Sequence, residues 1–352
     1  MENITKIKVG ISLGDPNGIG PEIILKTFRD SRMLDFCTPV IFANTKLMAH
    51  YKRELAINCN LLQIPGPGAA HPKNINVMDV WKEHLAINYG EEDATAGTYA
   101  VQSFTAAVSA LKENKIEALV TAPINKYSVQ SDTFSFPGHT EYLNEQLEGH
   151  ALMLMLSGSL RVGLLTGHVP IKEVPAKIDR ERIDKKIKTI HQSLVQDFGI
   201  RKPRIAVLGI NPHNGDKGVI GKEEGTVLKP ALDNIRNNGK LVFGPYAADS
   251  FFGSGNYKNF DAVLASYHDQ GLTPFKTLSF GKGVNFTAGL SGVRTSPDHG
   301  TAFDIAGKNK ADPSSFSEAV FTAISIYKNR RAHQQMASNP LQPQSQRPYG
   351  KK

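Results

Sequence analysis

The sequence of 352 residues has little cysteine and no long hydrophobic run, and these absences exclude several classes of protein. Its two cysteines, Cys37 and Cys59, have neither metal-binding nor redox spacing, so a disulfide framework is excluded. The most apolar stretch, residues 151–165, is interrupted by serines, a glycine and an arginine and is too short to cross a bilayer. The N-terminal residues show no signal-peptide pattern. We therefore expect a cytoplasmic protein without membrane association.

Excess positive charge is also scarce in the body of the chain, although the formal net charge is +8. Lysines and arginines number 41 against 33 aspartates and glutamates, but no acidic residue follows Glu318 and five of the excess charges lie in residues 330–352. The rest is nearly balanced, which argues against a nucleic-acid-binding surface on a folded domain. Residues 333–352 are basic and rich in Gln, Pro and Ser, so we expect a disordered tail there.

Short aliphatic and β-branched runs alternate with longer amphipathic stretches, a pattern typical of βαβ units and a largely parallel sheet. The pattern predicts strands at residues 7–13, 39–43, 118–121, 152–156, 162–166, 204–210, 262–266 and 284–288. It predicts helices at residues 21–32, 96–113, 179–198, 223–238 and 314–328. The expected fold class is therefore α/β.

Two segments that contain proline or glycine, residues 134–138 and 280–283, mark the expected crossings between domains. They predict a first α/β domain made of residues 1–133 and 284–332 and a second α/β domain of residues 134–283, followed by the tail of residues 333–352. In this arrangement the middle of the chain is an insertion into the first domain.

Of the eleven histidines, His168, His213 and His268 follow closely on predicted strands. In a parallel α/β sheet the carboxyl ends of the strands face the ligand crevice, so these side chains are displayed toward a ligand. Three neutral imidazoles that converge on one point would form a metal site with positions open for substrate. The alternative is that each histidine only hydrogen-bonds within its loop, because histidine is common on loops. The shared strand-end context favours the metal site.

Residues 14–22 (GDPNGIGPE) lie between a predicted strand and a predicted helix. In this place backbone N–H groups can meet an anion, or the segment can be no more than a tight turn. The glycine spacing is not that of the dinucleotide-binding fingerprint. Asp15, at the end of the strand, is a polar candidate for the site.

A second set of residues has the chemistry of an anion clamp. Thr140 is the expected N-cap of a helix and, with its neighbour His139, suits a phosphate group, although the segment taken alone slightly favours an ordinary capped helix. Further along the chain, Lys276, Asn285 and Arg294 combine two cations with an amide, and the arginine offers a bidentate fork.

Two carboxylates and one polar segment complete the candidates. Asp269 is adjacent to His268 and could orient that histidine or act as a base, and Asp249 lies in a loop of low charge. Residues 298–308 (DHGTAFDIAGK) have a density of polar groups and glycines that packing alone does not explain.

Taken together, these segments resemble the 4-hydroxythreonine-4-phosphate dehydrogenase family of pyridoxal phosphate biosynthesis. The matching blocks run from residue 10 to about residue 330 and are GDPNGIGPE, TAPINK, FPGHTEYL, LLTGHVP, LGINPHNGD, GPYAADSFF, SYHDQGLTPFK and residues 285–294. The resemblance implies a two-domain α/β/α fold similar to that of isocitrate and isopropylmalate dehydrogenases. It also implies an active site in the cleft between the domains, completed across a homodimer.

The resemblance implies roles for individual residues as well. The ligands of a divalent metal (Zn, Mg, Co or Mn), drawn from both subunits, match His168, His213 and His268. The positions that hold the phosphorylated substrate match His139, Thr140, Lys276, Asn285 and Arg294. The HGTAFDIAGK segment resembles an adenine-binding loop for NAD or NADP, which places His299, Gly300, Thr301 and Asp304 at the cofactor. Phe303 and Asp312 depart from the usual pattern of that loop.

The implied reaction is the NAD(P)-dependent oxidation of 4-phosphooxy-L-threonine at C3, followed by decarboxylation to 3-amino-2-oxopropyl phosphate. A bound metal would polarise the C3 oxygen and then stabilise the charge that develops as CO2 leaves. Lys276 is the first candidate for the general base, with Asp249 and Asp269 as alternatives. Three other functions stay open at this point: a dehydrogenase for 4-phospho-D-threonate or D-erythronate, a phosphate acyltransferase, and a non-catalytic protein that binds phosphate or metal.

Overall fold

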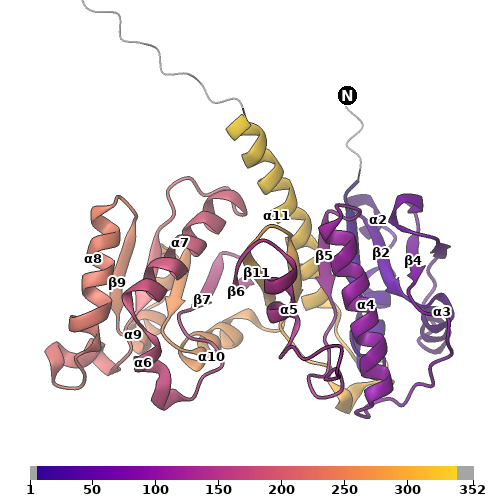
Figure 1. Cartoon of the computed structure of the whole chain (residues 1–352), viewed down its shortest axis with the longest axis horizontal. Helices are drawn as coiled ribbons and strands as arrows, with labels where there is room; N and C mark the ends of the chain where they lie inside the picture. Colours follow the sequence, from indigo (N-terminus) through magenta and orange to yellow (C-terminus); the bar gives the residue numbers. More distant parts are fainter. Residues whose placement is uncertain (1–5, 339–352) are drawn as a thin grey trace, which may run out of the picture.

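The computed structural model describes residues 6–338, in which one twelve-stranded sheet carries helices on both faces (Figure 1). The order of strands across the sheet is β3-β4-β2-β1-β5-β12-β11-β6-β7-β10-β8-β9. The strands are β1 (Lys8–Ser12), β2 (Thr38–Ala43), β3 (Leu61–Ile64), β4 (Ile75–Asp79), β5 (Ala118–Thr121), β6 (Gly149–Ser157), β7 (Leu160–Leu164), β8 (Ile205–Leu208), β9 (Val242–Tyr246), β10 (Ala262–Ala265), β11 (Val284–Leu290) and β12 (Arg294–Pro297). The predicted α/β class is confirmed.

The helices connect and cover these strands. They are α1 (Gly20–Thr27), α2 (Met33–Phe36), α3 (Thr45–Glu54), α4 (Ala94–Lys112), α5 (His139–Gln146), α6 (Val174–Lys177), α7 (Arg180–Gln196), α8 (Lys229–Asn237), α9 (Ala248–Gly253), α10 (His268–Ser279) and α11 (Ser314–Ser338). In Figure 1, α11 rises near the centre, with α2 to α4 on one side of it and α7 to α9 on the other.

The sheet is parallel except at its centre. There β6 runs antiparallel to both β11 and β7, and β11 runs antiparallel to β12. Because β12 is parallel to β5, the carboxyl ends of β5 and β12 and the beginning of β11 meet at the same edge of the sheet. Polar residues from these three strands can therefore form one site.

The two faces of the sheet bury their apolar side chains differently. On one face a continuous hydrophobic core extends from α1 and α11 to α7 and α8. On the other face the core is divided into two clusters, one beneath α4 and α5 and one beneath α9 and α10. The central strands lie between these two clusters, which leaves room for a cavity there.

The strands of the three predicted segments occupy separate parts of the sheet. Residues 1–133 supply the strands from β3 to β5 at one side of the sheet, and residues 134–283 supply those from β6 to β9 at the other. Residues 284–332 supply β12 and β11, which lie between them. One sheet nevertheless runs without a break through all three segments. The division into two domains therefore stays a prediction.

The prediction of a disordered tail from residue 333 is wrong for residues 333–338, because α11 continues to Ser338. Residues 329–338 are mostly good helix formers and include no proline or glycine, so nothing ends the helix at the expected place. The rest of the predicted tail, residues 339–352, lies outside the described residues. Neither α11 nor any other helix within residues 6–338 is long and apolar enough to cross a membrane.

Candidate active site

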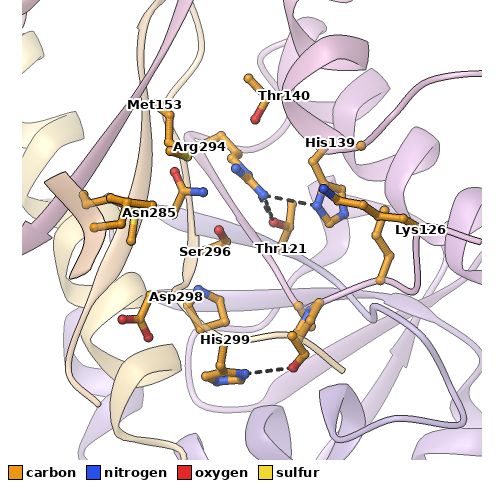
Figure 2. Close-up of a pocket in the computed structure, with 18 of the residues that line it drawn as sticks. Thr121, Lys126, His139, Thr140, Met153, Asn285, Arg294, Ser296, Asp298 and His299 are labelled. Atoms are coloured by element: carbon orange, nitrogen blue, oxygen red, sulfur yellow. Dashed lines mark hydrogen bonds between the residues drawn. The ribbon is translucent and has the colours of Figure 1, made fainter. Parts of the chain in front are cut away.

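A cavity of about 280 Å³ lies on the face of the sheet that carries the two smaller core clusters (Figure 2). Its floor consists of alternate residues of the central strands: Met153 and Met155 of β6, Asn285 of β11, and Arg294 and Ser296 of β12. Side chains alternate along a strand, so this spacing places all five on one face. Helix α5 forms one wall and α10 the other.

Arg294 is buried in this floor, with 3% of its surface exposed. Its guanidinium donates to Thr121 Oγ1 from Nε (3.1 Å) and from Nη2 (2.6 Å), and to Thr287 Oγ1 from Nη1 (3.1 Å). Within residues 6–338 no carboxylate forms an ion pair or hydrogen bond with it, and burial lowers the pKa of Arg294 to about 10. A buried cation without an internal counter-ion is costly, so this position is suited to an anion that a ligand supplies.

His139 begins α5 and extends this anion site. Its Nδ1 lies 3.2 Å from Arg294 Nη2. Burial, followed by the charges of Arg294 and Lys126, lowers the pKa of His139 well below its usual value, so the ring is neutral. Because arginine can only donate, Nδ1 is the acceptor and the ring proton resides on Nε2. Nε2 is buried without a partner in the described part of the chain and is therefore a free donor.

The other three predicted substrate-binding residues also line the cavity: Thr140, Lys276 and Asn285. The prediction that Thr140 caps the helix is wrong, because α5 begins at His139 and Gly138 occupies the N-cap position. Asn285 Oδ1 is buried without a partner among the described residues. Lys276 follows His268 by eight residues on α10, about two turns, so both side chains reach the same cavity.

Sequence reasoning gave no role to three other charged residues of the cavity: Lys126, Glu141 and Asp298. The turn that carries Lys126 is fixed by Asn125, whose Oδ1 accepts hydrogen bonds from the backbone N–H groups of Tyr127 (2.8 Å) and Ser128 (2.9 Å). The TAPINK and FPGHTEYL blocks were the available signals for the first two of these residues.

His168 and His268 lie together in the cavity, with ring centroids 5.4 Å apart. They follow the neighbouring parallel strands β7 and β10, which explains their proximity. Burial, followed by the charges of Lys126 and His268, lowers the pKa of His168 and so favours the neutral form that binds metals. His268 Nδ1 lies 2.7 Å from Asp269 Oδ1, a contact that leaves Nε2 of His268 available to a metal.

His213 lines a different cavity of about 590 Å³, together with Asp249 and Asp269. His268 and Asp269 are adjacent in the first turn of α10 but border different cavities, so this turn separates the two spaces. The three strand-end histidines therefore do not converge within one chain, and the expected metal site, with ligands from both subunits, stays a prediction. Residues 6–338 contain no group of three His, Cys, Asp or Glu side chains that could hold a metal ion.

The backbone at His213 is strained. Residues 213–217 all have positive φ angles, between 41° and 72°, and only Gly215 among them tolerates this conformation freely. The preceding turn is held by the buried Glu224, whose Oε1 accepts from the N–H groups of Ile210 (2.7 Å) and Asn211 (2.6 Å). The structure therefore holds the exposed His213 in an unfavourable conformation, which is typical of a functional residue.

The predicted cofactor segment is divided between the first cavity and the adjoining loop. His299 and Gly300 line the cavity, whereas Thr301 and Asp304 do not. His299 Nδ1 lies 3.0 Å from the carbonyl oxygen of Gly300, so Nδ1 donates and the buried Nε2 is an acceptor without a partner in the described residues. The carbonyl oxygen of Thr301 accepts from the N–H of Ile19 (3.0 Å), which joins this segment to the GDPNGIGPE loop.

Asp15 of that loop is fully buried behind the cavity wall. Its N–H donates to the carbonyl oxygen of Pro123 (2.9 Å), a residue that lines the cavity. Its Oδ1 accepts from the N–H of Asn17 (2.9 Å), while Oδ2 has no partner among the described residues. Burial raises the pKa of Asp15 to about 6.

The fold and the cavity together define the class of protein: an α/β protein with a buried arginine that no described carboxylate pairs, beside two neighbouring imidazoles. The family model described as "Pyridoxal phosphate biosynthetic protein PdxA" matches residues 35–323. The chain belongs to this family, as the sequence blocks predicted, and with it to a class of dehydrogenases.

Individual relatives match over nearly the whole chain. The 4-hydroxythreonine-4-phosphate dehydrogenase of Bacteroides thetaiotaomicron is 45% identical over 341 residues, which cover 96% of this chain and 94% of that protein. The solved structure of a putative 4-hydroxythreonine-4-phosphate dehydrogenase from Salmonella typhimurium superimposes with a TM-score of 0.79 at 34% identity, covering 91% and 99% of the two chains. That of the Klebsiella pneumoniae enzyme gives 0.77 at 34% identity, covering 94% and 100%.

Proposed function

We propose that this chain is a metal-dependent NAD(P) dehydrogenase that oxidises 4-phosphooxy-L-threonine at C3 and decarboxylates the product to 3-amino-2-oxopropyl phosphate. The observation that carries the proposal is Arg294, a buried cation whose hydrogen bonds go to two hydroxyls and a neutral imidazole rather than to a carboxylate. The names of the relatives support a phosphorylated hydroxy amino acid over a phosphorylated sugar acid, an acyl transfer or a purely binding role.

In this proposal the phosphate of the substrate lies against Arg294. Its oxygens accept hydrogen bonds from the guanidinium and from His139 Nε2–H, and bonds to a charged phosphate are stronger than neutral ones. Thr140 supplies a further donor at one wall. Asn285 Oδ1 accepts from a hydroxyl or ammonium group of the substrate, which gives this buried oxygen the partner that it lacks.

The divalent metal would be held by His168 and His268, whose rings lie close enough to share an ion. One further imidazole is needed, and we propose that it is His213 of a second copy of the chain. The active enzyme is then a homodimer in which each site draws on both subunits. Imidazole ligands favour Zn, Co or Mn over Mg. When bound, the metal supplies Lewis acidity at the C3 oxygen.

The cofactor, NAD or NADP, accepts the hydride from C3 when it is bound. His299 and Gly300 would contact it from within the cavity, with Thr301 and Asp304 on the adjoining loop. The free acceptor at His299 Nε2 suits an N–H or hydroxyl group of the cofactor.

Lys276 is the proposed general base, and its Nζ takes the proton from the C3 hydroxyl. Of the three candidates from the sequence, Lys276 lines the cavity that holds Arg294, whereas Asp249 and Asp269 line the cavity that holds His213. Lys276 lies on the same face of α10 as His268, so base and metal ligand act on the same end of the substrate.

The test is turnover of matched substrates by the purified protein, with each cofactor and each metal in turn. We expect NADH or NADPH to form, with release of CO2, from 4-phosphooxy-L-threonine. The same compound without its phosphate should react far more slowly, because Arg294 then remains without an anion. Turnover of 4-phospho-D-threonate in place of the phosphorylated amino acid would contradict the proposed substrate, and no turnover of any phosphorylated acid would contradict a dehydrogenase.

A further inference from the structure

A separate cavity of about 630 Å³ lies between α3 and the irregular segment of residues 80–89. It shares no lining residue with the candidate active site. The segment is held in place by Asn44, whose Nδ2 donates to the carbonyl oxygen of Trp81 (2.9 Å), and by the Tyr89 hydroxyl, which donates to Glu54. Its volume lies within the range of small-molecule sites, roughly 300–1,000 Å³.

Three acceptor side chains of this cavity, those of Asn44, Glu54 and Glu83, already accept from protein groups. Asn44 Oδ1 accepts from the N–H of Leu47 (3.1 Å) and caps α3. Glu54 accepts from the Tyr89 hydroxyl, and its other oxygen lies 3.3 Å from His50 Nε2. Glu83 accepts from the backbone N–H of Lys82 (3.0 Å). A ligand would therefore find few free acceptors here.

The donors, in contrast, are mostly free, although Arg53 Nη2 lies 3.5 Å from His50 Nδ1. The indole N–H of Trp81 is buried without a partner among the described residues, and only 5% of the residue is exposed. Lys46, Arg53 and Lys82 line the same cavity, and none forms an ion pair within residues 6–338. A buried donor without a partner costs free energy that a ligand acceptor would recover. Three cations without ion pairs in the described part of the chain and a free indole N–H, against two carboxylates that already accept from protein groups, favour an anionic ligand.

The body of such a ligand would be flat and apolar. Leu47 and Leu85 are buried side chains of the cavity and Ile87 is half-buried, while the half-buried Tyr89 supplies aromatic surface. The Trp81 ring packs against Tyr99, with ring centroids 4.9 Å apart, and offers the ligand its N–H edge. Aromatic faces favour stacking with a ring over contact with a flexible chain.

We propose that this cavity is a second ligand site, for a phosphate monoester on a heteroaromatic ring. The phosphate would meet Lys46, Arg53 and Lys82, and a ring acceptor would meet the indole N–H of Trp81. Two sources carry this chemistry: the adenosine 2′-phosphate part of a nucleotide and a phosphorylated pyridine such as pyridoxine 5′-phosphate. The site does not depend on the proposed dehydrogenase activity, because its residues take no part in it.

Trp81 is the only tryptophan of the chain, so fluorescence excited selectively over the ten tyrosines reports on the surroundings of Trp81. We expect adenosine 2′-phosphate or pyridoxine 5′-phosphate to change the emission of the full-length protein with saturation, after correction for light absorption by the probe. Whichever of the two binds identifies the source. Inorganic phosphate lacks the ring and pyridoxine lacks the phosphate, so each should bind much more weakly.

Variants decide whether the change comes from this cavity. Lys82→Ala should weaken binding of the probe about tenfold, because it removes one charge-assisted contact. Lys52→Ala, on α3 outside the cavity, should leave it unchanged. Trp81→Phe keeps the ring but loses the N–H, and equilibrium dialysis should show weaker binding. No saturable binding of either probe, or equal binding by the Lys82 and Lys52 variants, would overturn the proposal.

Discussion

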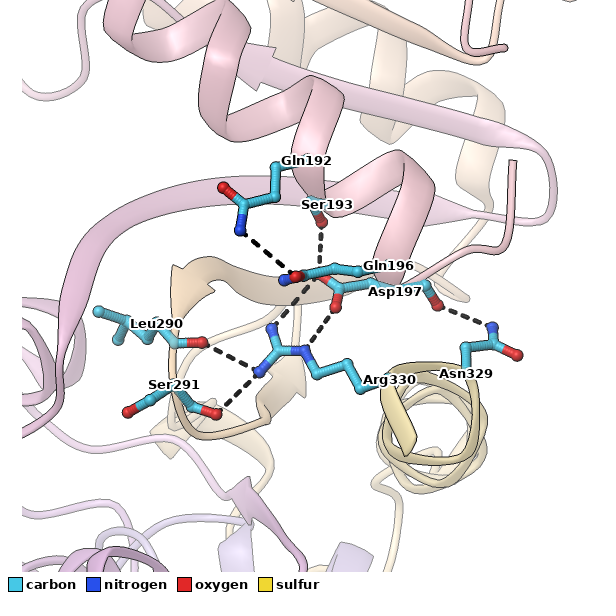
Figure 3. A network of polar contacts seen from close by, with 8 residues as sticks. All are labelled: Gln192, Ser193, Gln196, Asp197, Leu290, Ser291, Asn329 and Arg330. Atoms are coloured by element: carbon cyan, nitrogen blue, oxygen red, sulfur yellow. Dashed lines mark hydrogen bonds and ion pairs between the residues drawn. The ribbon is translucent and has the colours of Figure 1, made fainter. Parts of the chain in front are cut away.

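Two buried arginines, Arg294 and Arg330, lie on opposite faces of the central strands and have opposite surroundings. Arg330 of α11 forms a salt bridge from Nε to the carboxylate of Asp197, and its Nη1 donates to the carbonyl oxygens of Leu290 (2.9 Å) and Ser291 (3.0 Å) (Figure 3). Arg294 has hydroxyls and one imidazole around it and no carboxylate (Figure 2).

The difference distinguishes a charge that stabilises the fold, at Arg330, from a charge that is proposed to bind a ligand, at Arg294. The carboxylate that neutralises Arg330 is itself fully buried and receives a hydrogen bond from the Ser193 hydroxyl (2.6 Å), so both ions are satisfied inside the fold. This network joins α11, the end of α7 and the end of β11. Arg294 keeps its charge for a ligand and lowers stability in the free protein. We therefore expect changes at the two arginines to have opposite effects on stability and activity.

The largest effect is expected from His213→Ala, at the edge of the sheet where the carboxyl ends of the parallel strands lie. His213 is exposed and has no structural partner to lose, so the urea midpoint should stay unchanged while turnover falls below detection. The amount of metal bound per protomer should fall as well, because one of the proposed ligands is missing. The matched control is His150→Ala, an exposed histidine at the opposite edge, which should keep its activity. Normal turnover by His213→Ala with metal still bound would refute the proposed metal site.

At the opposite edge, Arg330→Met should destabilise the protein by about 4 kcal/mol, because it leaves Asp197 charged and unpaired in the interior. Urea unfolding measures this, with Arg331→Met, an exposed neighbour, as the control. Combining Arg330→Met with Asp197→Leu should cost less than the single change, since no charge is then left buried. A double variant as unstable as the single one would show that the network acts through the backbone carbonyls rather than through the ion pair.

Arg294→Met should give the reverse result. The free energy of unfolding should change by less than about 1 kcal/mol, because an unpaired buried charge is removed, while affinity for the phosphorylated substrate falls about 100-fold. Arg294→Lys retains the charge but loses the planar fork, so we expect an intermediate affinity. The measurements are KM with the phosphorylated substrate and the urea midpoint. A strong loss of stability in Arg294→Met would remove the distinction between the two arginines.

Much of the fold was predictable because buried strands are continuous apolar runs, such as β5 and β10, which the sequence located to within one residue. The two elements that carry much of the site were missed. Strand β12 reads RTSP and is polar, yet all four residues are buried because Arg294 and Ser296 face the cavity rather than solvent. Helix α10 contains Gly271 and Pro274, which usually end helices, so its turns were not expected.

The site itself was predictable only in part, for a geometric reason. A residue at the carboxyl end of a strand is placed at the correct edge of the sheet, and this brought His168 and His268 together. A position at the end of a strand does not predict on which side of a neighbouring helix the side chain lies. Here the first turn of α10 separates His213 from His168 and His268. Similarly, no sequence signal indicated that Arg294 lacks a carboxylate, because that depends on what the neighbouring strands place around it.

The smallest effect, on stability alone, is expected at Asp15, a buried acid behind the wall of the cavity that holds Arg294. Burial raises the pKa of Asp15 from 3.8 to about 6, so the folded protein binds this proton more tightly than the unfolded chain. Stability contributed by the protonated form is therefore lost as the pH rises from about 4 to about 6, by roughly 3 kcal/mol in total. Asp15→Asn removes the charge but weakens the bond to Asn17, so we expect a gain of about 1–2 kcal/mol near pH 7 and almost none near pH 4. Urea midpoints at the two pH values test this, and equal destabilisation at both would mean that the Asp15 carboxylate has a partner that stabilises its charge.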